Sequence, residues 1–511
     1  MCATPYRLDR VGSRLPPWVA VALVTIVCRL PAFFRTLLDD DEAQYAAIGE
    51  LVRGGAQLYG DGGVDFKPPG IYWTYAAVFS ASGRYAMWAM HAVALLVVVA
   101  TACMLAAIAA RIAGRRAGVL AGVFYGVFTT VYYPKMLAAN TEIFMMLALS
   151  AMTLLVMRAR EAPRTVTALA ALAGGGALVA IASGYKQSAA LNLAVIAAGV
   201  IATRAWLLRL IAAGAGFAAM LGIGALVVAA TSSLPAMWHW CVTQVVGKYG
   251  AGAWHGSVWH NIAVGLLPFI ASSLLVWIAG AARFARIRAA HAPERIVWVW
   301  FAISLASSFA GGHFFGHYFI QPLAPLSVLA ALEIDRWLAR PGRAAVRSVW
   351  ALTAIPAAGF FAFNLVFEPI TESFGAPDPD FRGPVAWVRS HTQRDDRIFV
   401  WGNFAPMYVL ADRLPASRFV GFMRGAERNK NVPPEVGWDT GPEVWPALAE
   451  DFARHPPAVV IDTSTADYMS FGNYPIRRFP QVAALLQHYR VAAVVDRVTL
   501  YVPADPALGG Q

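Results

Sequence analysis

Long apolar segments follow one another through the first two thirds of the chain, and this succession limits the folds that the chain can adopt. About 20 predominantly apolar residues span the hydrocarbon core of a bilayer as a helix. The sequence therefore predicts a mainly α-helical, polytopic membrane protein with about eleven spans. Their approximate ranges are 17–36, 85–109, 117–133, 141–157, 165–183, 188–203, 206–230, 261–282, 296–312, 317–338 and 348–367.

The composition supports a membrane protein rather than a nucleic-acid binder. Only 14% of the 511 residues are charged, whereas a soluble domain carries about 25%. A net charge of +11 could indicate a nucleic-acid partner. The basic residues, however, are spread over short loops between the apolar segments and form no single patch. We therefore expect contact with membrane lipids and no nucleic acid.

Basic residues crowd into every second connection, and this alternation predicts the orientation. Short loops rich in Lys and Arg stay in the cytoplasm. The basic tail and loops carry Arg7, Arg10, Arg14; Arg111, Arg115, Arg116; Arg158, Arg160, Arg164; Arg204, Arg209; Arg283, Arg286, Arg288, Arg295; and Arg336, Arg340, Arg343, Arg347. We expect these segments to be cytoplasmic and the other loops to face outward. The first apolar segment lacks a small-residue cleavage site, which favours an uncleaved first helix over a signal peptide.

The chain after the last apolar segment changes character. We predict a transmembrane domain at 1–369, with a catalytic first outer loop at about 37–84, and a soluble outer domain at 370–511. Short apolar runs in the second domain predict strands at Arg397–Trp401, Ala458–Asp462, Val491–Val495 and Val498–Val502, and helices at Pro442–Ala453 and Pro480–Tyr489. Alternating elements of this kind indicate a small α/β domain. It has no glycine-rich phosphate loop, so no nucleotide site is expected.

An acidic run opens the first outer loop. Asp39, Asp40, Asp41 and Glu42 follow directly on the first predicted span. Acidic residues at this place are also typical of helix capping, which accounts well for Asp39 and Asp40. A carboxylate beside a membrane span is partly desolvated, and desolvation would raise the pKa of Asp41 and make it a better base.

Basic residues near the same face are candidates for binding an anion such as a phosphate. Lys67 precedes Pro68 and Pro69, which fix a rigid, non-helical loop. Lys186 lies in a short outer turn between two spans. Either lysine could instead place its charge at the interface merely to keep it hydrated. Arg29 lies within the first span, where a guanidinium usually has a function or a partner.

Further polar residues stand at the same helix ends. Glu142 begins a span after Asn140 and Thr141, where it is either a capping acid or a second carboxylate of a site. His313 and His317 have the i, i+4 spacing that could hold a divalent metal, although the pair has no plain third ligand nearby. No cofactor is otherwise indicated.

Together, these residues resemble the motifs of the GT-C glycosyltransferases. The resemblance rests on the residues Asp41-Glu42 with Tyr45, Lys67-Pro68-Pro69 with Tyr72-Trp73, Glu142, His317-Tyr318 through Pro322 and Pro325, Phe399–Gly402 to Tyr408, and Pro415–Arg418. The bacterial branch with protein O-mannosyltransferase-like, aminoarabinose-transferase-like and galacturonosyltransferase-like proteins is the most similar. Members of the aminoarabinose branch often have an aspartate where this chain has Glu142, which weakens an assignment to that sugar.

The resemblance implies the GT-C fold and inverting transfer from a polyprenyl-phosphate sugar donor. It implies catalytic roles for Asp41, Glu42 and Glu142, with Asp41 or Asp40 as the general base. Candidate donor-phosphate ligands are Lys67, Lys186 and Arg29, and candidate substrate contacts are Tyr45, Tyr72, His317 and Tyr318. The acceptor would be lipid A, lipopolysaccharide core, another envelope glycan or a protein, outside a bacterial inner membrane. The alternatives are a lipid-linked sugar flippase or other transporter, an O-antigen ligase or polymerase, and a non-catalytic scaffold.

Overall fold

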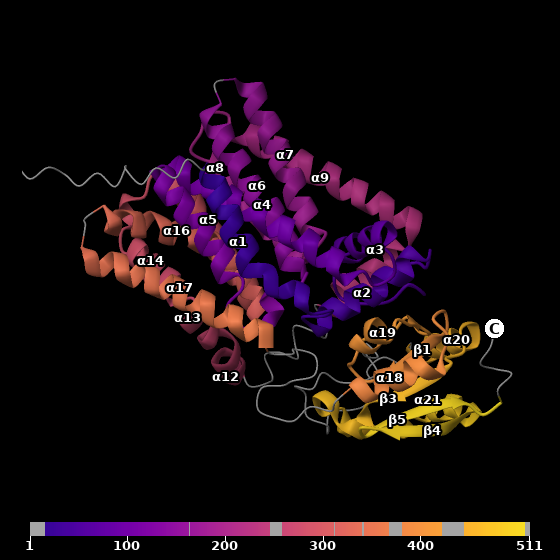
Figure 1. Cartoon of the computed structure of the whole chain (residues 1–511). Coiled ribbons are helices and arrows are strands. Elements are labelled where there is room, and N and C mark those ends of the chain that lie inside the picture. Colours follow the sequence, from indigo (N-terminus) through magenta and orange to yellow (C-terminus); the bar gives the residue numbers. More distant parts are fainter. Residues whose placement is uncertain are drawn as a thin grey trace, which may run out of the picture.

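The computed structural model describes residues 16–162, 164–245, 258–310, 312–339, 342–366, 381–421 and 444–505. A bundle of helices forms its larger part (Figure 1). The bundle helices are α1 (Pro17–Arg29), α4 (Met87–Ala113), α5 (Arg115–Phe128), α6 (Thr141–Glu161), α7 (Thr165–Ser183), α8 (Leu193–Val200), α9 (Trp206–Thr231), α10 (Leu234–Trp238), α12 (Val258–Asn261), α13 (Leu267–Ser272), α14 (Leu274–Phe284), α15 (Ala292–Phe309), α16 (Ile320–Leu338) and α17 (Arg343–Val366).

The lengths and composition of these helices confirm a multi-pass membrane protein. Six described helices are long and apolar enough to cross a membrane, and a seventh span results if the pair 258–272 and 274–284, bent by 85°, is counted as one. The predicted number of eleven spans stays a prediction, although each expected range coincides with helical structure. Helix α16 lies at the centre, because residues 320–334 are all buried.

Several arginines of the predicted cytoplasmic loops pair with acidic residues at the end of the bundle opposite helix α2 (Asp40–Arg53). Arg111 contacts Glu161 at 2.6 Å, and Arg116 contacts Asp335 at 2.5 Å. Arg283 binds Glu294 at 2.5 Å. The N-terminal arginines and the predicted boundary at 369–370 lie outside the described residues.

The predicted first outer loop forms two helices at the opposite end of the bundle. Helix α2 (Asp40–Arg53) and helix α3 (Gly70–Ser82) pack on each other and precede α4. Figure 1 shows both helices between the bundle and the C-terminal unit. The start of α2 follows the 3₁₀ helix Leu30–Phe34 that ends the first span.

The described residues 381–421 and 444–505 form a small α/β unit, as the sequence predicts. Its strands β1 (Arg397–Trp401), β2 (Leu414–Pro415), β3 (Val459–Asp462), β4 (Tyr489–Val495) and β5 (Val498–Pro503) form one sheet in the order β2-β1-β3-β5-β4. Its helices are α18 (Arg382–His391), α19 (Pro406–Ala411), α20 (Val444–Arg454) and α21 (Pro480–Leu485). Strand β1 is parallel to β2 and β3, with Val400 opposite Ile461, and β5 is antiparallel to β3 and β4.

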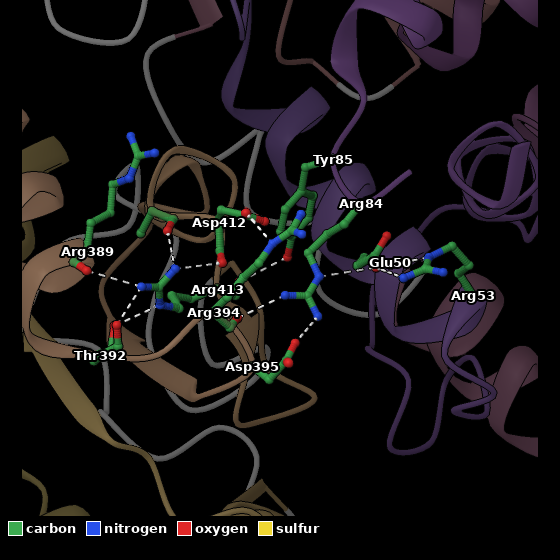
Figure 2. A network of polar contacts seen from close by, with 11 residues as sticks. Glu50, Arg53, Arg84, Tyr85, Arg389, Thr392, Arg394, Asp395, Asp412 and Arg413 are labelled. Atoms are coloured by element: carbon green, nitrogen blue, oxygen red, sulfur yellow. Dashed lines mark hydrogen bonds and ion pairs between the residues drawn. The ribbon is translucent and has the colours of Figure 1, made fainter. Parts of the chain in front are cut away.

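The α/β unit is joined to α2 and α3 through a shared apolar core and a polar network. One core cluster contains Leu58 and Tyr72 together with Phe399 and Trp401. Figure 2 shows the polar network, in which Arg84 contacts both Glu50 and Asp395. The segment 40–86 is therefore held in place by contacts with the α/β unit as well as by contacts with the bundle.

Candidate active site

Four segments that are distant in sequence meet at the end of the bundle that carries α2. They are the start of α2, the segment between α5 and α6 with its 3₁₀ helix Pro134–Met136, the turn after α7, and the 3₁₀ helix Gly316–Phe319 before α16. Each of them brings polar or charged side chains that the sequence analysis placed on one face. This end of the bundle is the candidate active site.

Two carboxylates from the acidic run share one ammonium group. Asp39 is the N-cap of α2, and its Oδ1 lies 2.7 Å from Lys135 Nζ. Asp41 Oδ2 lies 3.3 Å from the same nitrogen and 3.9 Å from His317 Nε2. Asn140 Nδ2 donates a 3.0 Å hydrogen bond to Asp39 Oδ2. Asp39 is thereby buried, whereas the Asp41 side chain is 37% exposed and open to a substrate.

The charges around these carboxylates correct the expectation that Asp41 has a raised pKa. Burial would raise the pKa of Asp41, but Lys135 and Lys67 outweigh it and hold that pKa well below its usual range. The raised pKa belongs to Asp39, because burial dominates there over the attraction of Lys135. Sequence reasoning did not single out Lys135, although it is a solitary lysine in a predicted outer loop like Lys186.

Glu42 has a structural position rather than the predicted catalytic one. It is fully buried, and Oε2 accepts a 2.9 Å hydrogen bond from Leu38 N. Its Oε1 lies 3.0 Å from His91 Nε2 and accepts a 2.9 Å hydrogen bond from Ala139 N. With both oxygens engaged, Glu42 ties α2 to α4 and to the segment that carries Lys135.

Arg29 also differs from its predicted role as a phosphate ligand. It is buried, and its Nη2 donates a 2.6 Å hydrogen bond to Leu137 O. Its Nη1 donates longer hydrogen bonds to the carbonyls of Thr129 and Met136. The guanidinium therefore holds the 129–137 segment in place, which is the partner that a charge within a span requires.

Glu142 and Lys186 form a buried ion pair. Lys186 Nζ lies 2.6 Å from Glu142 Oε1, and Glu142 is fully buried. Thr141 Oγ1 donates a 2.9 Å hydrogen bond to Glu142 Oε2. The same ammonium lies 3.7 Å from the centre of the Tyr318 ring, a cation–π geometry. Burial lowers the pKa of Lys186, and the Glu142 carboxylate opposes that effect.

The Lys67 loop is attached to the turn that carries Lys186. Gly70 N donates a 2.8 Å hydrogen bond to Gly184 O. A Cβ atom on Gly70 would lie 2.5 Å from that oxygen, so only glycine permits this close approach. Gln187 Nε2 donates a 2.7 Å hydrogen bond to Phe66 O. These bonds bring Lys67 close enough to act electrostatically on Asp41, Glu142 and Lys186.

Two of the predicted substrate contacts are instead packed inside the α2–α3 pair. Tyr72 is buried and donates a 2.6 Å hydrogen bond from its hydroxyl to Asp65 Oδ2. The Tyr45 ring packs edge-on against Tyr72 and Tyr75, with ring centres 5.9 and 6.1 Å apart. The structure thus gives Tyr45 and Tyr72 packing positions, whereas His317 and Tyr318 lie beside the charged groups.

The proposed metal pair, His313 and His317, lacks the geometry of a metal site. The Phe315 ring stacks nearly parallel against both imidazoles, with ring centres 5.3 and 6.1 Å away. Over the ranges that the structure describes, no group of three or more His, Cys, Asp or Glu side chains could hold a metal ion. The described side chains of His313 and His317 therefore do not by themselves fit a bound divalent metal.

The comparisons with known proteins agree with this fold. Residues 66–228 match the family described as dolichyl-phosphate-mannose-protein mannosyltransferase. No curated protein is significantly similar to the chain in sequence. The matched segment contains Lys67, Lys135, Glu142 and Lys186.

Solved structures of two membrane enzymes share the fold. ArnT from Cupriavidus metallidurans bound to undecaprenyl phosphate aligns with a TM-score of 0.64 at 14% identity, over 97% of this chain and 98% of that one. The Archaeoglobus fulgidus oligosaccharyltransferase AglB, in complex with an inhibitory peptide and a dolichol-phosphate, aligns with a TM-score of 0.55 at 12% identity, over 93% of this chain and 72% of that one.

The match over residues 66–228 and the shared fold agree with the resemblance to the GT-C membrane glycosyltransferases. Arg29 and His91, two ionisable residues within predicted spans that a transporter could use, contact a loop and Glu42 respectively.

Proposed function

We propose that the chain transfers a sugar from a polyprenyl-phosphate donor to an envelope acceptor, with inversion at the anomeric carbon. The observation that carries the proposal is the meeting of Asp41, Lys67, Lys135 and Lys186 at one end of the bundle. The three lysines share this end with the carboxylates of Asp39, Asp41 and Glu142. The Asp39 and Glu142 side chains are at most 5% exposed, whereas Asp41 is 37% exposed, which suits a base for a neutral hydroxyl nucleophile beside cations for an anionic leaving group. The lipid phosphates named with ArnT and AglB support a polyprenyl-phosphate donor.

Lys67 and Lys186 would bind the phosphate of the donor. As the bond between the anomeric carbon and the phosphate oxygen breaks, negative charge develops on the departing polyprenyl phosphate. Both ammonium groups lie in a partly buried setting, where such stabilisation is much stronger than in water. Glu142 then acts as a positioning residue, because it holds Lys186 above the Tyr318 ring.

Asp41 would accept the proton of the attacking hydroxyl. Asp40 is the weaker candidate, because its Oδ2 lies 3.4 Å from the Tyr468 hydroxyl of the α/β unit. A low pKa makes a free carboxylate a poor base. When the donor phosphate neutralises Lys67 and Lys186, their effect on Asp41 weakens and its pKa rises. Asp41 would therefore become an effective base only after the donor has bound.

The site would lie on the outer face of a bacterial inner membrane, with the N-terminus in the cytoplasm. The arginine clusters at the other end of the bundle support this orientation through the positive-inside rule. The α/β unit, about 370–511, would then be extracytoplasmic. Its contact with Asp40 through Tyr468 supports a role in placing the acceptor, which would be a lipid, glycan or protein of the envelope.

Asp41→Asn tests the proposed base. The purified protein in nanodiscs would be given a panel of polyprenyl-phosphate sugars and envelope extract, with release of polyprenyl phosphate as the readout. We expect transfer to fall by about 10²–10⁴-fold while undecaprenyl phosphate still binds. Asp61→Asn is the matched control, because Asp61 has the same 37% exposure in the same loop region.

Wild-type turnover by folded Asp41→Asn protein would exclude Asp41 as the base. If the wild-type protein transfers no sugar from any donor of the panel, the proposed transfer from a polyprenyl-phosphate sugar is contradicted instead. Mass spectrometry of envelope glycolipids and glycoproteins with and without the protein would identify the transferred sugar and its acceptor together.

A further inference from the structure

A cavity of about 370 Å³ lies between the end of the first span and helix α18 of the α/β unit. Arg35, Arg382 and Arg389 line it, together with apolar residues that include Phe34 and Leu37. Among the described residues of its wall there is no Asp or Glu. The cavity therefore combines three guanidinium groups with hydrocarbon, which is the complement of an anionic amphiphile.

The cavity opens at the level expected for lipid headgroups. The candidate span Pro17–Phe34 ends at its rim. The Phe34 side chain is 67% exposed, and aromatic residues at the end of a span are typical of the membrane–water interface. A ligand from the bilayer could therefore enter the cavity without leaving the membrane surface.

Two arginines of the cavity wall, Arg35 and Arg389, have donor groups that could bind an anion. Arg35 Nη2 donates hydrogen bonds to Leu365 O at 2.9 Å and Val366 O at 3.2 Å. Its Nε is buried and has no hydrogen-bond partner in the described part of the chain. A buried donor without a partner is unfavourable, and an anion would satisfy it. Figure 2 shows the Arg389 guanidinium directed away from the polar network that surrounds its backbone carbonyl.

We propose that this cavity binds the phosphate headgroup of a membrane lipid. Arginine pairs with phosphate through two parallel hydrogen bonds, which gives both strength and orientation. Phe34 and Leu37 contact the hydrocarbon next to the headgroup. This site uses residues other than Lys67 and Lys186, so it is separate from the proposed donor site and does not depend on the proposed reaction.

The cavity is connected to the acidic run by packed aromatic rings. Phe381 lines the cavity and stacks on Phe404, with ring centres 3.7 Å apart. The Tyr468 ring packs edge-on against Phe381 at 5.0 Å, and its hydroxyl donates to Asp40 Oδ2. A bound headgroup would thus stabilise the position of α18 relative to the start of α2.

Photo-cross-linking of the full chain in phosphatidylcholine nanodiscs tests the proposal. The probes are photoactivatable phosphatidic acid and photoactivatable phosphatidylcholine, and labelled peptides are identified by mass spectrometry. We expect the anionic probe to label the segments around 33–37 and 381–389. The labelling should fall about tenfold or more in Arg382→Gln/Arg389→Gln, because charge-assisted hydrogen bonds are lost. Arg490→Gln, an exposed arginine on strand β4, is the control.

Several outcomes would overturn the proposal. One is equal labelling of these segments by the phosphatidic acid and phosphatidylcholine probes. A second is labelling by the anionic probe that is unchanged in Arg389→Gln and in the double variant, or that falls as much in Arg490→Gln as in the double variant. A third is competition by inorganic phosphate that is as strong as competition by unlabelled phosphatidic acid. Thermal unfolding of each variant shows whether it is folded. Lys67→Met, which alters the proposed donor site and leaves the buried Glu142–Lys186 pair intact, should leave the labelling unchanged, so failure of the donor-site proposal is distinguishable from failure of this one.

Discussion

Removing Lys186 is the perturbation that tests the buried ion pair most directly. In Lys186→Met the fully buried carboxylate of Glu142 keeps, among the described residues, only the 2.9 Å hydrogen bond from Thr141. Leaving one member of a buried pair without its partner typically costs about 3–5 kcal/mol. We therefore expect the free energy of unfolding to fall by about that amount. Loss of the cation–π contact with Tyr318 belongs to the same change and should not be added separately.

The double variant separates the ion pair from the phosphate-binding role. In Lys186→Met/Glu142→Gln no buried charge is left, so we expect the free energy of unfolding to recover by about 2–3 kcal/mol relative to Lys186→Met. Binding of undecaprenyl phosphate should stay about 10- to 100-fold weaker in both variants, as expected for the loss of a charged hydrogen bond. Glu142→Gln alone should weaken binding of undecaprenyl phosphate less than Lys186→Met does, because the Lys186 ammonium group is kept but is no longer held in place by an ion pair.

Unfolding can be followed by tryptophan fluorescence in SDS titrations of the reconstituted protein, and binding by titration with undecaprenyl phosphate. If Lys186→Met unfolds at the same SDS fraction as wild type, Glu142 and Lys186 do not form a buried pair. If Glu142→Gln binds undecaprenyl phosphate as tightly as wild type, Glu142 does not position Lys186 for the ligand.

Two further variants test the surroundings of the site. Lys135→Met removes a cation that lowers the pKa of Asp41, so the carboxylate is protonated at higher pH and the acid limb of the kcat/KM profile should move to higher pH. Lys135→Arg should keep the wild-type limb, and an unchanged limb in Lys135→Met would show that Asp41 does not control it. Gly70→Ala places a methyl group against Gly184 O and should raise KM for the donor by about tenfold or more. Gly222→Ala, which meets nothing within 4 Å, should leave KM and stability unchanged, and equal effects of the two substitutions would refute the proposed loop contact.

Much of the fold could be predicted from local patterns. The expected strand Arg397–Trp401 is observed with the same bounds, and β5 begins at Val498 as expected. Asp496 and Arg497 both have positive φ, 49° and 68°, which suits the tight hairpin between β4 and β5. These features depend on residues close in sequence, so hydrophobic periodicity and turn chemistry are sufficient to predict them.

The pairing of charged residues could not be predicted in the same way. The sequence indicates that Arg29 needs a partner, but the partners are carbonyls more than a hundred positions later. Glu42 looked like a second acid beside Asp41, yet helix geometry turns it inward to His91 and Ala139 N. The pKa of Asp41 depends on Lys135 and Lys67 from two other loops. Contacts between residues so far apart in sequence arise only from tertiary packing.

The apolar core shared by α2, α3 and the α/β unit affects how such enzymes could be recombined. A chimaera that exchanged residues 381–505 alone would break hydrogen bonds such as Val64 N to Arg418 O and Tyr85 Oη to Arg413 O. It would also pack the apolar surface of the α2–α3 pair from one parent against a sheet from another parent, although the two surfaces did not evolve together. A transferable module should therefore include residues 40–86 together with the C-terminal segment, although nearly 300 positions separate them in the chain.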